Sequence, residues 1–396
     1  MDGGKEGTKE LTPRERLLKT LAHEEPDRIP VKCIFHRGLY YKLKRHFGVS
    51  TNAEVRRRLG IYENIDAHKY GYISVSRGPH RCWRPTPKLL DFYSKLYPPD
   101  SDPDYTSPVT SETYLEYVWY EEWGIERSLG VSQGNNPRSY FFTRHPLADT
   151  PLDEFEFPDN NLDRFDVAKT IIKDYKDNYV ILGLIWGPFW AHLWQLRGMF
   201  QLIRDFYTNP QFITKLLDRE LRFSLEHARI LMELGADGVL LDDDWGTENG
   251  TWLNPTLWRK YVKPRFLEFV SSIRKRGGIV FFHTDGNVNA LLPDIVESGV
   301  DVLNPVQPEC MDPVEVRRLY GDKISLMTGI GVQRTLPYGT VQEVKNETIN
   351  AIKLLAPGGG FGYGTAHEAR EECPVANIIA LCETMQKYGR YPIART

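Results

Sequence analysis

The sequence predicts an α/β protein built as a (β/α)8 TIM-type barrel with an elaborated N-terminal region. From Tyr179 onward, strand-like apolar runs alternate with helical segments, which is typical of βα units on a parallel sheet. Polar residues directly follow several of these runs, as they do in barrel enzymes. No G-x-G-x-x-G motif follows a strand, which argues against an open dinucleotide-binding sheet.

Length and composition allow one large domain and narrow the class of partner. The chain has 396 residues and a net charge of -3, and it lacks a strongly basic stretch, so we expect no nucleic-acid partner. The 5 cysteines are scattered without a C-x-x-C pair, as expected for reduced thiols in the cytoplasm. No apolar run approaches the roughly 18 residues of a membrane span, so we expect no membrane association. The expected partner is a small molecule.

The elements follow in chain order. Thr12, Pro13 and Glu15 have the N-cap, first-turn proline and early acidic residue of a helix that runs to about His23. Residues 1–10 are expected to be a loose tail, residues 11–396 a single barrel domain, and residues 50–178 insertion or cap elements. Strands are predicted at 29–35, 180–185, 238–241, 279–282, 302–303, 324–327 and 361–363, with an eighth placed at 72–76, and later helices at 212–234, 255–276, 341–355 and 374–388.

Polar residues collect where four predicted strands end. Asp242-Asp243-Asp244 follow one strand, His283-Thr284-Asp285 another, Asn304 a third and His367 a fourth. The carboxyl ends of barrel strands meet at one rim, so these residues are predicted to lie together. Alternation along an extended segment sends Asp242 and Asp244 to one side and Asp243 to the other.

The rim residues allow both a functional and a structural interpretation. His283 and Asp285 are two apart and face the same way, and His367 would complete a set of two histidines and one carboxylate, which suits zinc or ferrous iron. An H-x-D pattern also arises when a histidine is merely oriented by hydrogen bonds. The aspartates could bind a cation, act as a general base or cap the next helix. Trp186 and Trp194, around Gly187-Pro188, could line a pocket or only pack.

These rim motifs, with Thr12-Pro13-Arg14-Glu15-Arg16 and Gly389-Arg390-Tyr391-Pro392, resemble the uroporphyrinogen decarboxylase superfamily over roughly residues 11 to 392. That superfamily of barrels also contains corrinoid-dependent methyltransferases. Its decarboxylases hold substrate carboxylates with an R-Q-A-G-R motif, which aligns here with residues 35–39, so both arginine positions are apolar. The resemblance therefore points away from porphyrinogen decarboxylation, although His367 matches a functional position of the family.

The thiol-accepting methyltransferase branch binds zinc through H-x-C and a later Cys, and these positions look like His283, Asp285 and His367. The resemblance thus implies a methyltransferase that moves a methyl group from a small donor, such as an aryl methyl ether or a methylamine, to a separate corrinoid protein, assisted by zinc. Asp243 or Asp244 would supply or position a proton. The expected catalytic residues are Asp243, Asp244 and His367, the expected metal ligands are His283, Asp285 and His367, and the expected substrate-binding residues are Trp186, Trp194, His36, Arg37 and Asn304.

Two other functions stay open. One is a metal-free decarboxylase or lyase acting on a carboxylated small molecule or tetrapyrrole, with His367 as proton donor and Arg37 or Arg197 as carboxylate clamp. The other is a ligand-binding barrel without catalytic activity. A homodimer is included among the expected assemblies.

Overall fold

The computed structural model describes residues 10–61, 68–69, 72–77, 122–130 and 139–393, so the predicted tail 1–10 lies almost wholly outside the described residues. The described strands are Val31–Lys32 (β1), His68–Lys69 (β2), Tyr72–Val75 (β3), Glu126–Gly130 (β4), Ser139–Arg144 (β5), Val180–Trp186 (β6), Gly238–Asp242 (β7), Ile279–His283 (β8), Val302–Val306 (β9), Ser325–Thr328 (β10) and Phe361–Gly364 (β11).

The helices lie mostly in the C-terminal two thirds of the chain. None in the described part is long and apolar enough to cross a membrane. They are Pro13–Leu21 (α1), Arg37–Phe47 (α2), Asn52–Arg58 (α3), Pro146–Asp149 (α6), Asp166–Tyr175 (α7), Ala191–Arg197 (α8), Met199–Thr208 (α9), Pro210–Glu233 (α10), Pro255–Leu257 (α11), Lys263–Lys275 (α12), Leu292–Glu297 (α13), Pro313–Tyr320 (α14), Thr335–Tyr338 (α15), Val341–Leu355 (α16) and Val375–Tyr388 (α17), with a 3₁₀ turn at Leu162–Phe165 and a π turn at Trp258–Val262.

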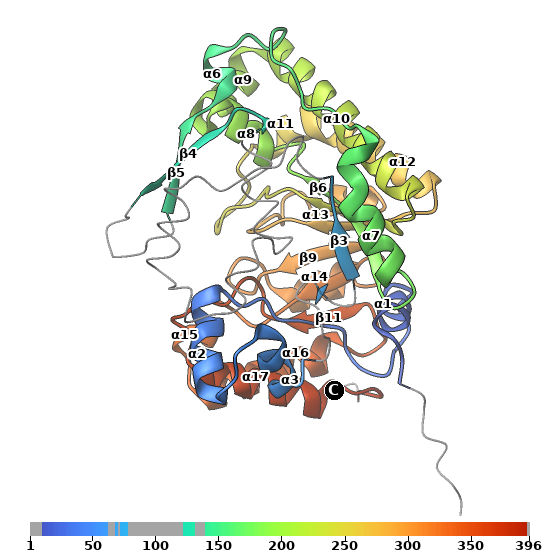
Figure 1. Ribbon diagram of the computed structural model, residues 1–396, viewed down its shortest axis with the longest axis vertical. Coiled ribbons are helices and arrows are strands. Elements are labelled where there is room, and N and C mark those ends of the chain that lie inside the picture. The colour runs from blue at the N-terminus through green and yellow to red at the C-terminus, as the bar shows by residue number, and fades with distance from the viewer. Residues whose placement is uncertain (1–9, 62–67, 70–71, 78–121, 131–138, 394–396) are drawn as a thin grey trace, which may run out of the picture.

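Eight parallel strands of the described residues form one curled sheet in the order β1-β11-β10-β9-β8-β7-β6-β3, and β2 is added antiparallel at the β3 edge. The later helices lie on the outer side of this sheet (Figure 1). This arrangement confirms the predicted (β/α)8 TIM-type fold. The strand placed at 72–76 is β3, which pairs with β6 and so supplies the eighth strand.

Side chains alternate between the two faces of the sheet. Leu240, Phe281 and Val302 belong to an inner cluster, whereas their neighbours Leu241 and Phe282 pack among the outer helices. Both sets are buried, so these strands are apolar throughout their length, as is usual for parallel sheets. Continuous burial explains why the sequence showed them as unbroken apolar runs.

Two predicted elements differ from the structure. The strand expected at 29–35 is a continuous strand only at Val31–Lys32, where it pairs with β11, and Phe35 adds an isolated parallel bridge to Ala369. The helix expected at 255–276 contains the π turn just before Pro264, whose ring nitrogen cannot donate a helical hydrogen bond. Helices α8 and α9, which the sequence did not predict, begin after Trp190 and Gly198 without a side-chain cap.

Residues 50–178 contain more than cap elements, although much of this range lies outside the described residues. Strand β3 joins the barrel sheet. The β4–β5 hairpin is a separate two-stranded sheet, and α6 contacts α8. The division into a tail and a single barrel domain with insertions stays a prediction.

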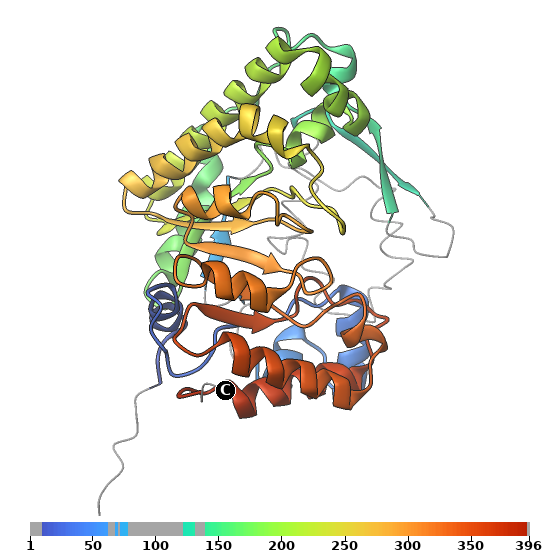
Figure 2. The ribbon, with the colours of Figure 1, turned by 180° about the vertical axis from the view of Figure 1, so that it is seen from behind.

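The two ends of the described chain lie side by side. Strand β1 pairs with β11, α2 contacts α17, and Arg28 bridges to Arg390. Both ribbon views show the blue helices α2 and α3 beside the red C-terminal helices (Figures 1 and 2). The barrel therefore depends on contacts between its first and last segments.

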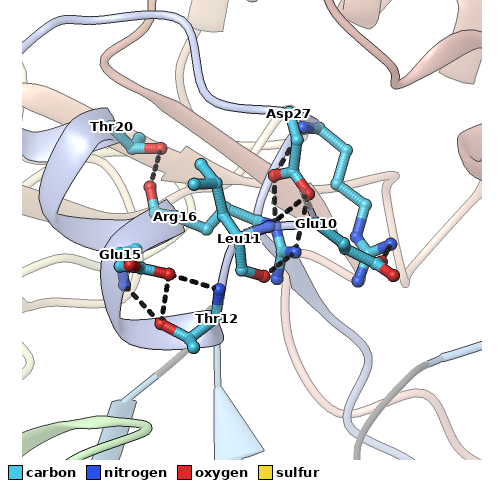
Figure 3. A network of polar contacts seen from close by, with 8 residues as sticks. Glu10, Leu11, Thr12, Glu15, Arg16, Thr20 and Asp27 are labelled. Atoms are coloured by element: carbon cyan, nitrogen blue, oxygen red, sulfur yellow. Dashed lines mark hydrogen bonds and ion pairs between the residues drawn. The ribbon is translucent and has the colours of Figure 1, made fainter. Parts of the chain in front are cut away.

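A polar network fixes α1, the first of those segments, to the chain that follows it (Figure 3). Thr12 is the predicted N-cap residue, and together with Glu15 it forms a capping box. The guanidinium of Arg16, which is almost fully buried, donates to both carboxylate oxygens of Asp27 at 2.7 and 2.9 Å and to the carbonyl of Leu11. This double hydrogen bond connects α1 to the segment that leads into β1.

The Arg16–Asp27 pair predicts a pH-dependent stability. We expect Arg16→Met to lower the free energy of unfolding by about 2 kcal/mol at pH 7, because Asp27 loses its charged partner. Burial alone would raise the pKa of Asp27, but the Arg16 hydrogen bond lowers it below its usual value. A lowered carboxyl pKa stabilises the fold above about pH 4 and stops doing so as the pH falls through the folded-state pKa.

Urea unfolding at pH 7 and pH 3 checks this prediction. The difference between wild type and Arg16→Met should shrink at pH 3, and Arg16→Lys should recover part of the loss at pH 7. An equal loss at both pH values would mean that Arg16 acts only through packing.

Candidate metal centre and active site

Four side chains form a row across the C-terminal end of the inner sheet face. Parallel register pairs Trp186 with Asp242, Asp242 with His283, and His283 with Asn304. Each lies two residues after a member of the inner cluster, so all four side chains face the inner side of the sheet. The cluster members are Leu184, Leu240, Phe281 and Val302. The sheet register itself therefore brings polar groups from separate strands together.

His283 Nε2 faces a group of carboxylates. It lies 3.9 Å from Asp242 Oδ1, 3.8 Å from Asp244 Oδ1 and 3.8 Å from Asp285 Oδ1. His367, which follows β11, also approaches Asp285: its Nε2 lies 3.3 Å from Asp285 Oδ2. One ligand atom each from His283, Asp285 and His367 lies within 4.8 Å of the others, and Asp242, Asp244 and His283 form a second such group.

The donor set fits a zinc ion. Ligands about 2.0–2.2 Å from zinc in a tetrahedron are separated by about 3.3–3.6 Å. The two carboxylate oxygens of Asp285 lie at comparable distances from the histidines, Oδ1 at 3.8 Å from His283 Nε2 and Oδ2 at 3.3 Å from His367 Nε2. Asp285 Oδ1 is buried and accepts no hydrogen bond from the described residues. A buried carboxylate oxygen without a donor is a position that a cation would satisfy. The three predicted ligands thus lie where a metal could bind, and metal binding itself stays a prediction.

The charges of the cluster also favour a cation. Burial raises the pKa of Asp285, and burial together with the Asp285 charge raises the pKa of Asp244 to about 6. Burial lowers the pKa of His283 below its ordinary 6.5, despite the opposing effect of Asp285 and Asp244. Neutral imidazole is the form that binds a metal, and a divalent ion would relieve the repulsion among the carboxylates.

Two crossing loops hold Asp285 in place. A Cβ at Gly246 would lie 2.6 Å from the Asp285 carbonyl oxygen, and one at Gly286 would lie 2.5 Å from the Gly246 carbonyl carbon, so any side chain at either position would force the loops apart. Gly286 also has φ of 84°, which favours glycine. The backbone N–H of Asp285 donates to Asp244 Oδ1 at 3.0 Å. The glycines of D-D-D-W-G and H-T-D-G-N therefore let the two acidic loops touch.

The aspartate triplet divides as alternation predicted. Asp242 and Asp244 lie by His283, whereas Asp243 is fully buried away from it. The Asp243 carboxylate accepts hydrogen bonds from three consecutive backbone N–H groups, at 189 to 191, and from the Trp245 indole. Burial raises its pKa to about 7 against the effect of these donors. The structure therefore places Asp244 at the cluster and Asp243 in the support of the β6–α8 loop.

The predicted aromatic pair is split. Trp186 is in the row beside Asp242, and its indole Nε1 is buried without a hydrogen-bond acceptor among the described residues. Trp194 lies on α8 and packs edge-on against Phe142 of the β4–β5 hairpin, with ring centres 4.9 Å apart. Only Trp186 adjoins the metal ligands by strand register.

Two of the other residues expected to contact a substrate, His36 and Arg197, are engaged with protein groups. His36 caps α2 by accepting from Gly38 N–H and lies 3.6 Å from the Glu371 carboxylate. The backbone of Arg37 begins α2, but its side chain lies outside the described residues. Arg197, the alternative carboxylate clamp, binds Asp205 at 2.7 Å. Arg197 therefore already has a carboxylate partner on its own chain.

Lys32 is a site residue that the motif search missed. It is almost fully buried on β1, and its Nζ lies 3.3 Å from Asn304 Oδ1. Asn304, expected to bind substrate, is 1% exposed and instead bonds to His283 Nδ1 at 2.9 Å. The sequence did contain a signal for this residue, namely a lysine inside the apolar run 29–35. Buried lysines almost always have a polar partner, so Lys32 could have been expected to contact a polar group.

Comparison with known proteins gives one family and several distant relatives. The sequence matches the profile of the Uroporphyrinogen decarboxylase (URO-D) family over residues 129–388. It is 27% identical over 176 residues to the methylcobamide:CoM methyltransferase MtaA of Methanosarcina barkeri, covering 43% of this chain and 48% of that protein. It is 22% identical over 235 residues to a uroporphyrinogen decarboxylase of Coxiella burnetii, covering 57% of this chain and 62% of that protein.

A solved structure shares the fold over nearly its whole length. A methyltransferase from Methanosarcina mazei superposes with a TM-score of 0.63 at 20% identity, covering 96% of this chain and 99% of that one. The curated relatives are matched less completely, since the chain spans between about half and two thirds of the length of the two named above. These matches establish the family and the fold.

Proposed function

The chain belongs to the uroporphyrinogen decarboxylase family, and from this membership we propose that it is a methyltransferase that passes a methyl group from a small methylated donor to a separate corrinoid protein. The observation that supports this most is the convergence of His283, Asp285 and His367, in which the buried Oδ1 of Asp285 accepts no hydrogen bond from the described residues. Curated relatives that are methyltransferases add to this support.

His283, Asp285 and His367 would hold zinc. When bound, the ion supplies Lewis-acid assistance to the heteroatom that loses its methyl group. The protein residues prepare the ligands of this site. Burial keeps His283 neutral, and Asn304 fixes its ring so that Nε2 faces the cluster. This arrangement keeps the ligand nitrogen ready without a rearrangement.

Asp244 is the residue that we propose to carry the proton. As the methyl group leaves, the donor heteroatom keeps the bonding electron pair and must take up a proton. With a pKa of about 6, the Asp244 carboxyl is protonated in a useful fraction of molecules near neutral pH. Its Oδ1 accepts from the Asp285 backbone, so the proton resides on Oδ2. Asp243 has a structural part in this proposal.

Trp186 is proposed as the surface against which the donor lies. Its backbone pairs with that of Asp242 in the sheet, so the two residues lie on neighbouring strands about 4.8 Å apart. A flat indole suits an aryl methyl ether through stacking and a methylamine through cation–π attraction. Of the two clamps that the lyase alternative offers, Arg197 is paired with Asp205, and the side chain of Arg37 lies outside the described residues.

A methyl-transfer assay tests the proposal. The zinc-loaded protein is incubated with cob(I)alamin and a panel of methoxylated aromatics and methylamines, and methylcobalamin formation is followed by absorbance. We expect transfer from at least one donor class, loss of transfer in Asp244→Asn, and unchanged transfer in Asp174→Ala, an exposed aspartate on α7. No transfer from any donor, combined with decarboxylation that persists after chelation, would replace this function with the lyase.

A further inference from the structure

The side chain of Asn304 is held in one orientation by two partners of opposite kind. Lys32 Nζ can only donate a hydrogen bond when charged, and it lies 3.3 Å from Asn304 Oδ1. The carbonyl of Met327 can only accept, and Asn304 Nδ2 donates to it at 3.2 Å. A flipped amide would place its NH2 group against the lysine and its oxygen against the carbonyl. Both contacts would then be repulsive, so the amide oxygen of Asn304 must lie on the side of Lys32.

The fixed amide in turn decides which nitrogen of His283 carries the proton. Asn304 Oδ1 is an acceptor and lies 2.9 Å from His283 Nδ1. A hydrogen bond at this contact requires a proton on Nδ1. The neutral ring then presents the lone pair of Nε2 to Asp244, Asp285 and the other groups of the cluster. The opposite tautomer would place a hydrogen where a metal has to bind.

We propose that Lys32 and Asn304 form a positioning pair that holds His283 in its Nδ1–H tautomer before any metal binds. Neither residue is a predicted ligand, and both come from strands other than that of His283. Asn304 touches the imidazole, and Lys32 acts through Asn304. Both side chains are almost fully buried in the inner layer, so solvent does not compete for these hydrogen bonds.

The inference deepens the proposed metal site and rests on it for its purpose, but it concerns the metal-free protein. The test is therefore made without metal. Nitrogen-15 NMR of histidine-labelled apo protein at pH 8 distinguishes the two neutral tautomers by their ring-nitrogen shifts, and His283→Gln identifies the signals of His283. We expect wild type to show the Nδ1–H form alone.

Variants of the pair should change this spectrum in different ways. Asn304→Leu removes the acceptor, and Lys32→Met frees the amide to turn, so both should let the Nε2–H form appear. Asn304→Asp keeps an acceptor oxygen and should keep the wild-type tautomer. Lys44→Met is the matched control, because Lys44 is equally buried but lies on α2 and not in the inner layer. It should leave the spectrum of His283 unchanged.

A Nε2–H signal in wild type, or Nδ1–H alone in both Asn304→Leu and Lys32→Met, would overturn the inference. Zinc titration then connects it to the proposed function: Asn304→Leu should bind zinc about 10–100-fold more weakly than wild type, and Asn304→Asp should not share that loss. For Lys32→Met only the tautomer is compared with wild type. Its zinc affinity is not, because removing the positive charge of Lys32 itself favours binding of a cation. Correct tautomers without zinc binding in wild type would refute the metal site and leave the positioning pair standing.

Discussion

Alanine at His283 is expected to reduce zinc binding from about one ion per chain to a trace. The substitution removes the nitrogen that lies nearest the centre of the carboxylate group, with Asp242, Asp244 and Asp285 all within 3.9 Å. Loss of a supporting residue typically weakens a metal site about 10–100-fold, so loss of a ligand should weaken it by at least about 100-fold. Elemental analysis and competition with a chelating dye measure the change.

Asp285→Ala and His367→Ala should behave similarly, since each removes one member of the same set. His46→Ala, an exposed histidine on α2, is the control and should bind zinc as wild type does. Thermal unfolding gives a second measurement: zinc at about 100 times its dissociation constant should add about 2.7 kcal/mol to the stability of wild type and nothing to that of the ligand variants. Zinc that stays bound in all three variants would place the metal elsewhere.

Alanine at Asp243 is expected to lower the free energy of unfolding by about 3–5 kcal/mol, although this residue touches no predicted ligand through its carboxylate. Its two oxygens accept three backbone N–H groups and the Trp245 indole, at 2.7 to 3.1 Å, in a fully buried position. Alanine would leave four buried donors without an acceptor, and each such group costs about 1–3 kcal/mol before relaxation. Urea unfolding followed by circular dichroism measures the loss.

The controls separate this support from general effects of charge. Asp243→Asn keeps one acceptor oxygen and should lose about half as much stability, whereas the exposed Asp174→Ala should change it by less than about 0.5 kcal/mol. Zinc affinity distinguishes Asp243 from Asp244, because Asp244 lies by His283 whereas the Asp243 carboxylate binds the β6–α8 loop. A variant at Asp243 that folds normally but abolishes catalysis with bound metal would return Asp243 to the catalytic group.

The barrel was predictable because its strands are buried on both faces. Runs such as residues 238–241 and 279–282 are apolar at every position, and each ends directly in polar residues. The split of the aspartate triplet also followed from simple alternation. What alternation could not give was the partner of each side chain, since Asp243 binds a loop more than fifty residues away.

The protein partners of Asn304 could not be predicted for the same reason. A polar residue after a strand was expected to contact substrate, but Lys32 lies 272 positions earlier in the chain and occupies the amide oxygen together with His283. Two-residue strands such as β1 are also hard to detect, because they are defined only by pairing with β11. Long-range contacts of this kind are fixed by the assembled sheet and leave no local pattern.

The pairing of β1 with β11 has a consequence for how the protein is made. Lys32 leaves the ribosome early, whereas Asp285 and His367 emerge only after most of the barrel has been synthesised. A nascent chain that stops short of residue 367 therefore has the first acidic loops but lacks the last histidine of the cluster. The set of His283, Asp285 and His367 can therefore form only when translation has passed residue 367.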